Sequence, residues 1–428
     1  MKPTIRIRSI MMGFLASDTR RSLGHLLGRL QRSTGPTVHY FHQVDDPYSH
    51  IAVQKLDTLR SRYQVQFNCH LVPSPTPAFQ GDSERFAHWA LRDARTIASY
   101  YGACLPDAID QIDPEQTAIA AAELASLLAS DQFADRATKL GNSLWSNETL
   151  PASDFPDAPH HIESGGKLRE KLGHYLGAMF YFEGEWYWGV DRLYHLEHRL
   201  IAMGYCNKPD APICVQRPAA ESATGKNAKE ITLEYFPSLR SPYTAISFDR
   251  TIDLVQRSGV QLKLRPVMPM MMRGIPAPRA KQMYIITDTK REAEAAGVPF
   301  GRIVDPFGDP VIRAFSLFPY LAEQGKDVDF ASAYLRGAWA EGIDITTDDG
   351  IRIIAESVGI NWHDAEKHLG SSQWQAVLEH NVNDMLNAGL WGVPSFRVTG
   401  GNNAEPFCCW GQDRLWRVET EISLRANS

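Results

Sequence analysis

Trp410-Gly411-Gln412-Asp413-Arg414-Leu415 stands near the end of this 428-residue chain, shortly after a Gly-Val-Pro-Ser-Phe stretch at positions 392–396. Together these residues predict a loop with a Val-Pro bond, a strand, a turn, a second strand that ends in Trp, and a helix that starts after a glycine. A very similar stretch, Trp188-Gly189-Val190-Asp191-Arg192-Leu193, occurs earlier in the chain. A repeat of this kind indicates two copies of one fold.

The beginnings of the two copies also match. Residues 37–48 and residues 232–243 both contain a run typical of a strand, a short loop, and a Pro-Tyr pair that opens a helix. The anchors keep the same order in both copies, and the second copy has a longer middle. Chance similarity of short stretches is therefore the weaker explanation.

Each copy predicts the order strand, helix, strand, helices, β-hairpin, helix. The first two strands should be parallel, because a right-handed helical crossover joins them. In the first copy we expect single helices over 47–61 and 164–176, and in the second a helix over 361–388 and another that ends at Gly259, a residue type suited to a helix C-terminus. The predicted organisation is an extension (1–35), a first domain (36–204), a linker (205–229) and a second domain (230–428).

Composition excludes several classes of protein. The net charge is −6, hydrophobic residues make up 43% of the chain and charged residues 22%, as in ordinary globular proteins. No basic excess indicates a nucleic-acid surface, no apolar run is long enough for a membrane span, and we expect no metal site. The six cysteines form no Cys-x-x-Cys pair, and we interpret each as a small buried hydrophobic residue.

The first 35 residues are basic. A signal peptide is one interpretation, but the apolar run is short and no convincing cleavage site follows it. Leu23, Leu26, Leu27 and Leu30 recur at helical spacing. We favour an amphipathic helix that packs on the body, or a partly mobile extension, in a cytoplasmic protein.

Five motifs in order carry a family resemblance. They lie at positions 236–243, 264–266, 339–345, 392–396 and 410–415. They resemble the 2-hydroxychromene-2-carboxylate isomerase and kappa-class glutathione transferase family, a branch of the DsbA-like thioredoxin superfamily. The resemblance covers nearly all of 230–426 and, more weakly, 36–203. It implies an α/β protein with two tandem thioredoxin-like (DsbA-like) domains, each with a helical insertion.

Ser241 is the candidate catalytic residue. It precedes Pro242 at the expected start of a helix, where a serine commonly serves as the N-cap. Free N–H groups and the partial positive charge of a helix N-terminus would also favour a thiolate. The resemblance implies that Ser241 poises the thiol of glutathione there.

Val393, Pro394, Gln412 and Asp413 are the candidate cofactor-binding residues. The resemblance implies a cis Val393–Pro394 bond, with the Val393 backbone directed to glutathione. It also implies that Gln412 and Asp413 bind the γ-glutamyl end. The alternatives are a structural turn at Pro394 and a helix cap at Asp413, since a carboxylate is stabilised at a helix N-terminus.

The sequence departs from the family at two places. The loop after the second strand of the second copy has a Met cluster and no Asn, so Arg273, Arg279 or Lys281 is left to hold a carboxylate. In the first copy Asp46 replaces the serine, and Ala178-Met179 replaces Val-Pro. An Asp would repel a thiolate, so we interpret the first copy as degenerate or structural.

The resemblance implies a glutathione-dependent isomerase or transferase for a small electrophilic, aromatic substrate. Glutathione would add to the substrate, permit bond rotation or a proton shift, and leave. The alternative is a thioredoxin-fold module that binds a thiol or peptide without redox activity. A disulfide oxidoreductase ranks last, because that chemistry needs the absent cysteine pair.

Overall fold

The computed structural model describes residues 3–31, 35–152, 155–401 and 405–427. The chain divides into two compact units. The N-terminal unit comprises Thr19–Pro218 and Pro278–Tyr284; the C-terminal unit comprises Met1–Asp18, Ala219–Ala277 and Ile285–Ser428. No helix in the described part of the chain has the length and apolar character needed to cross a membrane.

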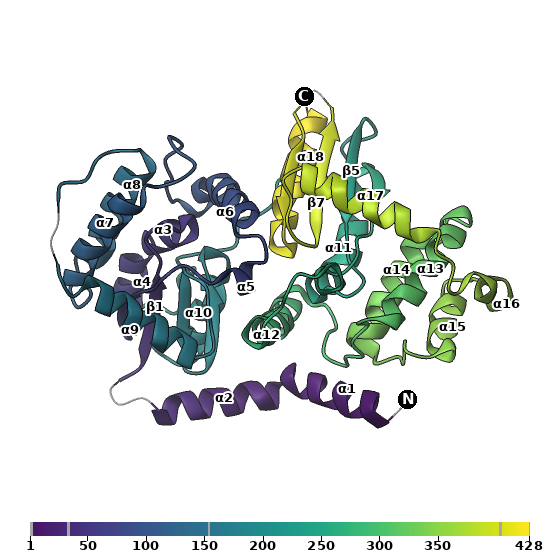
Figure 1. Cartoon of the computed structure of the whole chain (residues 1–428), viewed down its shortest axis with the longest axis horizontal. Helices are drawn as coiled ribbons and strands as arrows, with labels where there is room; N and C mark the ends of the chain where they lie inside the picture. Colours follow the sequence, from purple (N-terminus) through teal and green to yellow (C-terminus); the bar gives the residue numbers. More distant parts are fainter. Residues whose placement is uncertain (1–2, 32–34, 153–154, 402–404, 428) are drawn as a thin grey trace. The chain divides into compact units, whose positions relative to one another are not determined.

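The N-terminal unit contains the sheet β2-β1-β3-β4, of which Figure 1 labels β1. Its strands are β1 (Thr37–His42), β2 (Gln66–Leu71), β3 (Met179–Phe182) and β4 (Glu185–Trp188), and its helices are α2 (Asp18–Gln31), α3 (Pro47–Val53), α4 (Leu56–Arg62), α5 (Pro77–Gln80), α6 (Ser83–Ala98), α7 (Pro114–Ser126), α8 (Phe133–Trp145), α9 (Ala158–Lys171) and α10 (Leu193–Ala202). Strand β1 pairs in parallel with β2 and antiparallel with β3.

The C-terminal unit contains the sheet β6-β5-β7-β8, with the same pairing directions. Its strands are β5 (Ile231–Phe236), β6 (Gln261–Leu264), β7 (Ser395–Gly400) and β8 (Phe407–Trp410), and its helices are α1 (Pro3–Leu15), α11 (Pro242–Ser258), α12 (Arg279–Ala296, of which 279–284 belong to the N-terminal unit), α13 (Asp309–Glu323), α14 (Asp327–Arg336), α15 (Asp348–Ser357), α16 (Trp362–Ala365), α17 (Trp374–Asn387) and α18 (Leu415–Asn427). A π-helical turn (Gly337–Glu341) follows α14.

The predicted parallel pairing of the first two strands and the closing hairpin are confirmed in both units. Helix α11 ends as expected at Gly259, which has a φ of 71° that glycine adopts without strain. The rings of Tyr235 and Phe396 stack across β5 and β7 with centroids 5.1 Å apart. Tyr40 and Phe180 form the corresponding pair in the N-terminal unit at 4.6 Å.

Three predicted helices differ in the structure. The helix expected over 47–61 is broken at Gln54 and Lys55 into α3 and α4. The one expected over 361–388 is α16, a 3-10 turn and α17, with Gly370 at a φ of 80° between them. The one expected over 164–176 is α9, which begins at Ala158 and ends at Lys171. The helical periodicity of apolar residues continues across the two breaks and past the observed ends of α9, so the sequence pattern did not show where these helices stop.

The prediction that the Leu23 to Leu30 stripe packs on the body is wrong. These four leucines are 47–73% exposed. Helix α2 contacts its unit through Gly24 and Gly28, and a Cβ added at Gly28 would overlap the backbone of Glu183. Glycines permit this close approach of the two backbones, so the small face of the helix is the packed one.

Candidate functional site

The predicted site residues share one edge of the C-terminal sheet. Phe236 at the end of β5 pairs with Ser395 at the start of β7, and Ser395 pairs with Trp410 at the end of β8. Ser241 follows β5, Val393 and Pro394 precede β7, and Gln412 and Asp413 follow β8. The strand register therefore brings all five to the edge where β5 and β8 end.

Ser241 is the N-cap of α11, a helix of 17 residues. Its Oγ accepts a hydrogen bond from the Thr244 N–H at 3.2 Å, and Pro242 occupies the first turn, where its missing N–H has little cost. Within the described residues the Ser241 hydroxyl has no acceptor for its own proton. The hydroxyl is half-buried and can donate to a ligand at the positive end of the helix dipole.

The Val393–Pro394 bond is cis, as the family resemblance implied. The Pro394 carbonyl accepts from the Gly411 N–H at 2.9 Å, which connects the start of β7 to the turn after β8. The Ser395 hydroxyl donates to the Gly392 carbonyl at 2.6 Å. In the part of the chain that the structure describes, the Val393 backbone makes no hydrogen bond, so its polar groups are available to a ligand.

Gly392 has no room for a side chain. A Cβ there would overlap the indole ring of Trp410. We expect Gly392→Ala to lower the free energy of unfolding by about 1–3 kcal/mol, because overpacking forces a shift of the ring or backbone. Urea titration checks this, with Gly35→Ala as control, where the added methyl group meets nothing within 4 Å. Equal stability of the two variants would contradict the expectation.

Gln412 and Asp413 differ in what surrounds them. The Gln412 side chain is 2% exposed, donates to Glu292 and accepts from Arg250 at 3.4 Å. It therefore holds the start of the last helical segment to α12 and α11. Asp413 lies in the 3-10 turn before α18, with Oδ1 3.8 Å from Nη1 of Arg414, and its side chain is 13% exposed.

Two of the three candidate cations in the Met-rich loop differ in their contacts. Lys281 donates to the Phe79 carbonyl at 2.7 Å in the N-terminal unit, and burial lowers the pKa of its amine to about 8. Arg273, in the 3-10 turn Met270–Arg273, is half-buried with its Nε unpaired, and burial lowers the pKa of its guanidinium. No carboxylate among the described residues pairs with Arg273, which leaves this cation suited to an anionic ligand.

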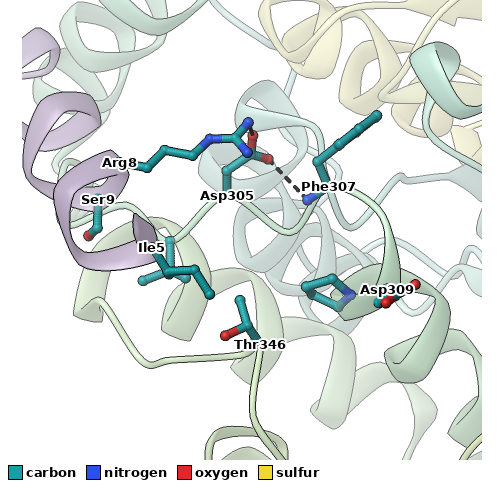
Figure 2. Close-up of a pocket in the computed structure, with 9 residues that line it drawn as sticks. Ile5, Arg8, Ser9, Asp305, Phe307, Asp309 and Thr346 are labelled. Atoms are coloured by element: carbon teal, nitrogen blue, oxygen red, sulfur yellow. Dashed lines mark hydrogen bonds and ion pairs between the residues drawn. The ribbon is translucent and has the colours of Figure 1, made fainter. Parts of the chain in front are cut away.

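The C-terminal unit has a cavity of about 290 Å³, shown in Figure 2, and none of the five predicted site residues lines it. Its wall includes Asp305, whose carboxylate pairs with Arg8 of α1 at 2.6 Å and with Arg240 at 2.9 and 3.1 Å. The Arg240 guanidinium also lies over the Phe307 ring at 4.7 Å. The lining residues are Ile5, Arg8, Ser9, Val304, Asp305, Phe307, Asp309, Pro310 and Thr346. Arg240, whose side chain pairs with Asp305 in the cavity wall, directly precedes the N-cap residue Ser241 in the chain.

The equivalent edge of the N-terminal unit is filled by internal hydrogen bonds. Asp46 is the N-cap of α3 and accepts from the backbone N–H and the hydroxyl of Ser49, at 2.8 and 2.7 Å. The Ser49 Oγ accepts in turn from the Ala178 N–H at 2.8 Å. A Cβ added at Gly177 would lie 3.0 Å from this Oγ and 3.1 Å from Asp46 Oδ2. Little space remains there for a ligand.

The strand register corrects the alignment of the two units. Met179 pairs with Trp188 and Phe41, as Ser395 pairs with Trp410 and Phe236. Ala178 is thus the counterpart of Pro394, and Gly177 that of Val393, one position earlier than the sequence comparison placed them. Ala178 has a φ of 53°.

The cysteines vary in exposure, which corrects the expectation that each is buried. Cys69 and Cys409 are buried, Cys104 is exposed, and Cys206, Cys214 and Cys408 are intermediate. Burial raises the pKa of the Cys69 thiol to about 12 and that of Cys214 to about 11. These two thiols are therefore poor nucleophiles at neutral pH.

The sequence analysis missed a buried ionic cluster in the C-terminal sheet. Glu234, on β5 and 5% exposed, accepts from Arg265 at 2.7 Å and from Arg397. Arg265 also pairs with Asp384 at 2.8 Å. A glutamate within an otherwise apolar strand was the available signal, because such a charge must be paired when it is buried. By strand register His39 and His70 hold the matching positions, with Nδ1 and Nε2 3.0 Å apart.

Residues 232–423 match the model of the DSBA-like thioredoxin domain, so the C-terminal half has a thioredoxin-like DsbA fold. Among solved structures, a 2-hydroxychromene-2-carboxylate isomerase is 19% identical, with 45% of this chain and 95% of that chain covered and a TM-score of 0.38. The cytosolic disulfide reductase DsbM from Pseudomonas aeruginosa is 18% identical, with 45% and 98% covered and a TM-score of 0.35. No curated protein sequence matches the chain.

Proposed function

We propose that the C-terminal unit is a glutathione-dependent isomerase or transferase for a small electrophilic, aromatic substrate. The observation that carries the proposal is the Ser241 hydroxyl, which caps a 17-residue helix as an acceptor and keeps its own proton available. It lies at the sheet edge that also holds the cis Val393–Pro394 bond. In a DsbA-like fold this is the edge at which strands end and ligands gather.

Each group would have a separate task toward glutathione. Ser241 and the N-terminus of α11 stabilise a negative charge on sulfur, since both present hydrogen-bond donors to it. The Val393 backbone, which makes no hydrogen bond to any described residue, can pair with a peptide backbone. Arg273, half-buried and without a carboxylate partner among the described residues, would hold a carboxylate. Asp413, at the first turn after β8, would hold the α-amino group.

Bound glutathione would supply a thiolate that adds to the substrate and leaves again. The protein would position that sulfur, lower its pKa and withhold water from the electrophile. The preference for an aromatic compound comes from the family resemblance.

Ser241→Ala is expected to reduce turnover by about tenfold or more, the scale of one lost transition-state donor. Initial rates with glutathione and either 2-hydroxychromene-2-carboxylate or a chloronitrobenzene measure this. Loss of the N-cap alone would cost about 1 kcal/mol of stability. Ser241→Asn separates the two effects, because it retains a capping acceptor and lacks the hydroxyl. Parental turnover in Ser241→Asn would remove the hydroxyl from the mechanism.

We infer that the N-terminal unit is a degenerate copy of the same domain. In support, Tyr48 donates to Asp93 and Tyr243 donates to Asp288, both at 2.8 Å, and each pair connects the helix after the first strand to a later helix. Both sheets also have the same strand order. This proposal divides the chain into an extension (1–35), a first domain (36–204), a linker (205–229) and a second domain (230–428).

A thiol- or peptide-binding module without catalysis is the second candidate. The observation that favours it is the Gln412 side chain, a predicted glutathione-binding group that already donates to Glu292 and accepts from Arg250. Retention on immobilised glutathione with no turnover would support this module. Either function suits the cytoplasm, whose reducing conditions keep thiols free.

A further inference from the structure

The two N-terminal helices each expose an apolar stripe. In α1 the stripe is Ile7, Ile10, Met11 and Phe14, with 48–63% of each residue exposed. In α2 it is Leu23, Leu26, Leu27 and Leu30, with 47–73% exposed. Both stripes follow the spacing i, i+3, i+4, i+7, which places four side chains on one face of a helix. Eight of the thirteen large hydrophobic residues exposed in the described part of the chain belong to these two helices.

The opposite face of each helix is the one that contacts its own unit. In α1, Ile5 and Ser9 line the cavity wall, and a Cβ at Gly13 would lie 3.3 Å from the Gly301 carbonyl oxygen. In α2, Gly24 and Gly28 approach Gly184 and Glu183. The contacting face of α2 is thus formed by small residues and that of α1 includes Ile5, whereas the apolar stripes are the exposed faces.

Charge identifies what these stripes fit. Residues 1–35 contain seven lysines and arginines and one aspartate, a net charge of +6 in a chain whose total is −6. A second copy of this segment would carry the same charge and would repel it. A bilayer with anionic headgroups offers both an apolar layer for the stripes and the opposite charge for the basic residues.

We propose that α1 and α2 bind the surface of an anionic lipid bilayer. Each helix would lie in the plane of the interface, with its stripe among the acyl chains. Arg8, Arg21 and Arg29 form ion pairs with acidic residues of the units, so the headgroups would be contacted by the remaining basic residues of the segment, such as Arg6. The described helices are too short and insufficiently apolar to span the bilayer, so the attachment is peripheral. The proposal is independent of any activity at Ser241.

The test is flotation of the full-length protein with vesicles. We expect the bound fraction to rise at least about tenfold when phosphatidylglycerol is added to phosphatidylcholine vesicles, and to fall as salt screens the charges. The double variant Ile10→Gln and Leu26→Gln should abolish most of this binding. Because both side chains are exposed, its circular dichroism and its urea midpoint should match those of the parent.

A matched control substitutes Ile353 and Val377 with Gln, since they are equally exposed, at 50% and 53%, and lie on α15 and α17. This control should bind vesicles as the parent does. Equal vesicle binding by parent and stripe variant would overturn the proposal. A dimer of the parent in analytical ultracentrifugation would also overturn it, if the stripe variant is a monomer and the parent does not bind vesicles. The stripes would then be covered by a second copy of the chain.

Discussion

Glu234→Gln is expected to lower the free energy of unfolding by about 3–5 kcal/mol, the range for breaking a buried ion pair. Glu234 is 5% exposed and accepts from both Arg265 and Arg397. Burial opposes its ionisation, but hydrogen bonds and charge from Arg397 and Arg265 outweigh burial and lower the pKa of the carboxyl. Without that charge two guanidinium groups remain in the sheet. Of these, Arg265 keeps a carboxylate partner in Asp384, whereas Arg397 has no other ion pair within the described residues.

Urea unfolding at neutral pH measures the loss. The matched control is Glu341→Gln, which removes an ion pair with Arg336 whose side chains are 46% and 49% exposed. Exposed pairs contribute about 0–1 kcal/mol, so this control should remain close to the parent. A loss below about 1 kcal/mol in Glu234→Gln would show that the arginines stay solvated and that the cluster does not stabilise the sheet.

Acidification is expected to destabilise the N-terminal unit well above the pH at which carboxylates usually titrate. Burial lowers the pKa of His42 to about 3, that of His50 to about 4 and that of His70 to about 4, with His39 also acting on His70. Burial also lowers the pKa of His174. The pKa of these histidines is 6.5 in the unfolded chain and lower in the folded unit. Between these two pKa values the unfolded chain binds protons that the folded unit does not, so stability falls as pH falls.

Asp46 acts in the opposite direction. Burial raises the pKa of its carboxyl to about 6, against the hydrogen bonds from Ser49 that lower it. Between pH 6 and the pKa of this carboxyl in the unfolded chain, the folded unit binds one proton more than the unfolded chain. Stability from this group therefore rises as pH falls. The three histidines with folded pKa values of about 3 to 4 outweigh this single group. Three histidines against one carboxyl leave a net difference of about two protons, or about 3 kcal/mol per pH unit between pH 6 and 5, and His174 adds to this loss.

His42→Phe tests this account. Tyr40 donates to the Ser49 carbonyl at 2.9 Å, so the substitution leaves that hydroxyl proton paired, and a phenyl ring retains the contact with Phe133. The pH dependence of the unfolding free energy should weaken by about 1.4 kcal/mol per pH unit, the value of one proton. His363→Gln replaces a side chain that is 78% exposed, and it should leave the pH dependence of the unfolding free energy unchanged. A His42 ring that titrates near pH 6.5 in the folded protein would contradict the prediction.

The same pair of positions thus has different chemistry in the two units. His39 and Glu234 lie at matching positions on the first strand of each sheet, and His70, near the end of β2, matches Arg265, which directly follows β6. The C-terminal unit holds its pair by charge, whereas the N-terminal unit holds two neutral rings by burial. We therefore expect acid to affect the N-terminal unit first.

The sequence by itself determined the order of strands and helices, the parallel and antiparallel pairings, and the positions of Ser241, Pro394 and Asp413 at strand and helix ends. Local rules are sufficient for these features: proline and glycine mark turns, and apolar periodicity marks the elements. Only the tertiary structure decided which side chains are committed to internal contacts. It placed Gln412 against Glu292, joined Asp46 to Ala178 through Ser49, and left the α2 leucines in solvent. These outcomes depend on partners distant in the chain, and periodicity shows that a helix has an apolar face without showing which face is packed.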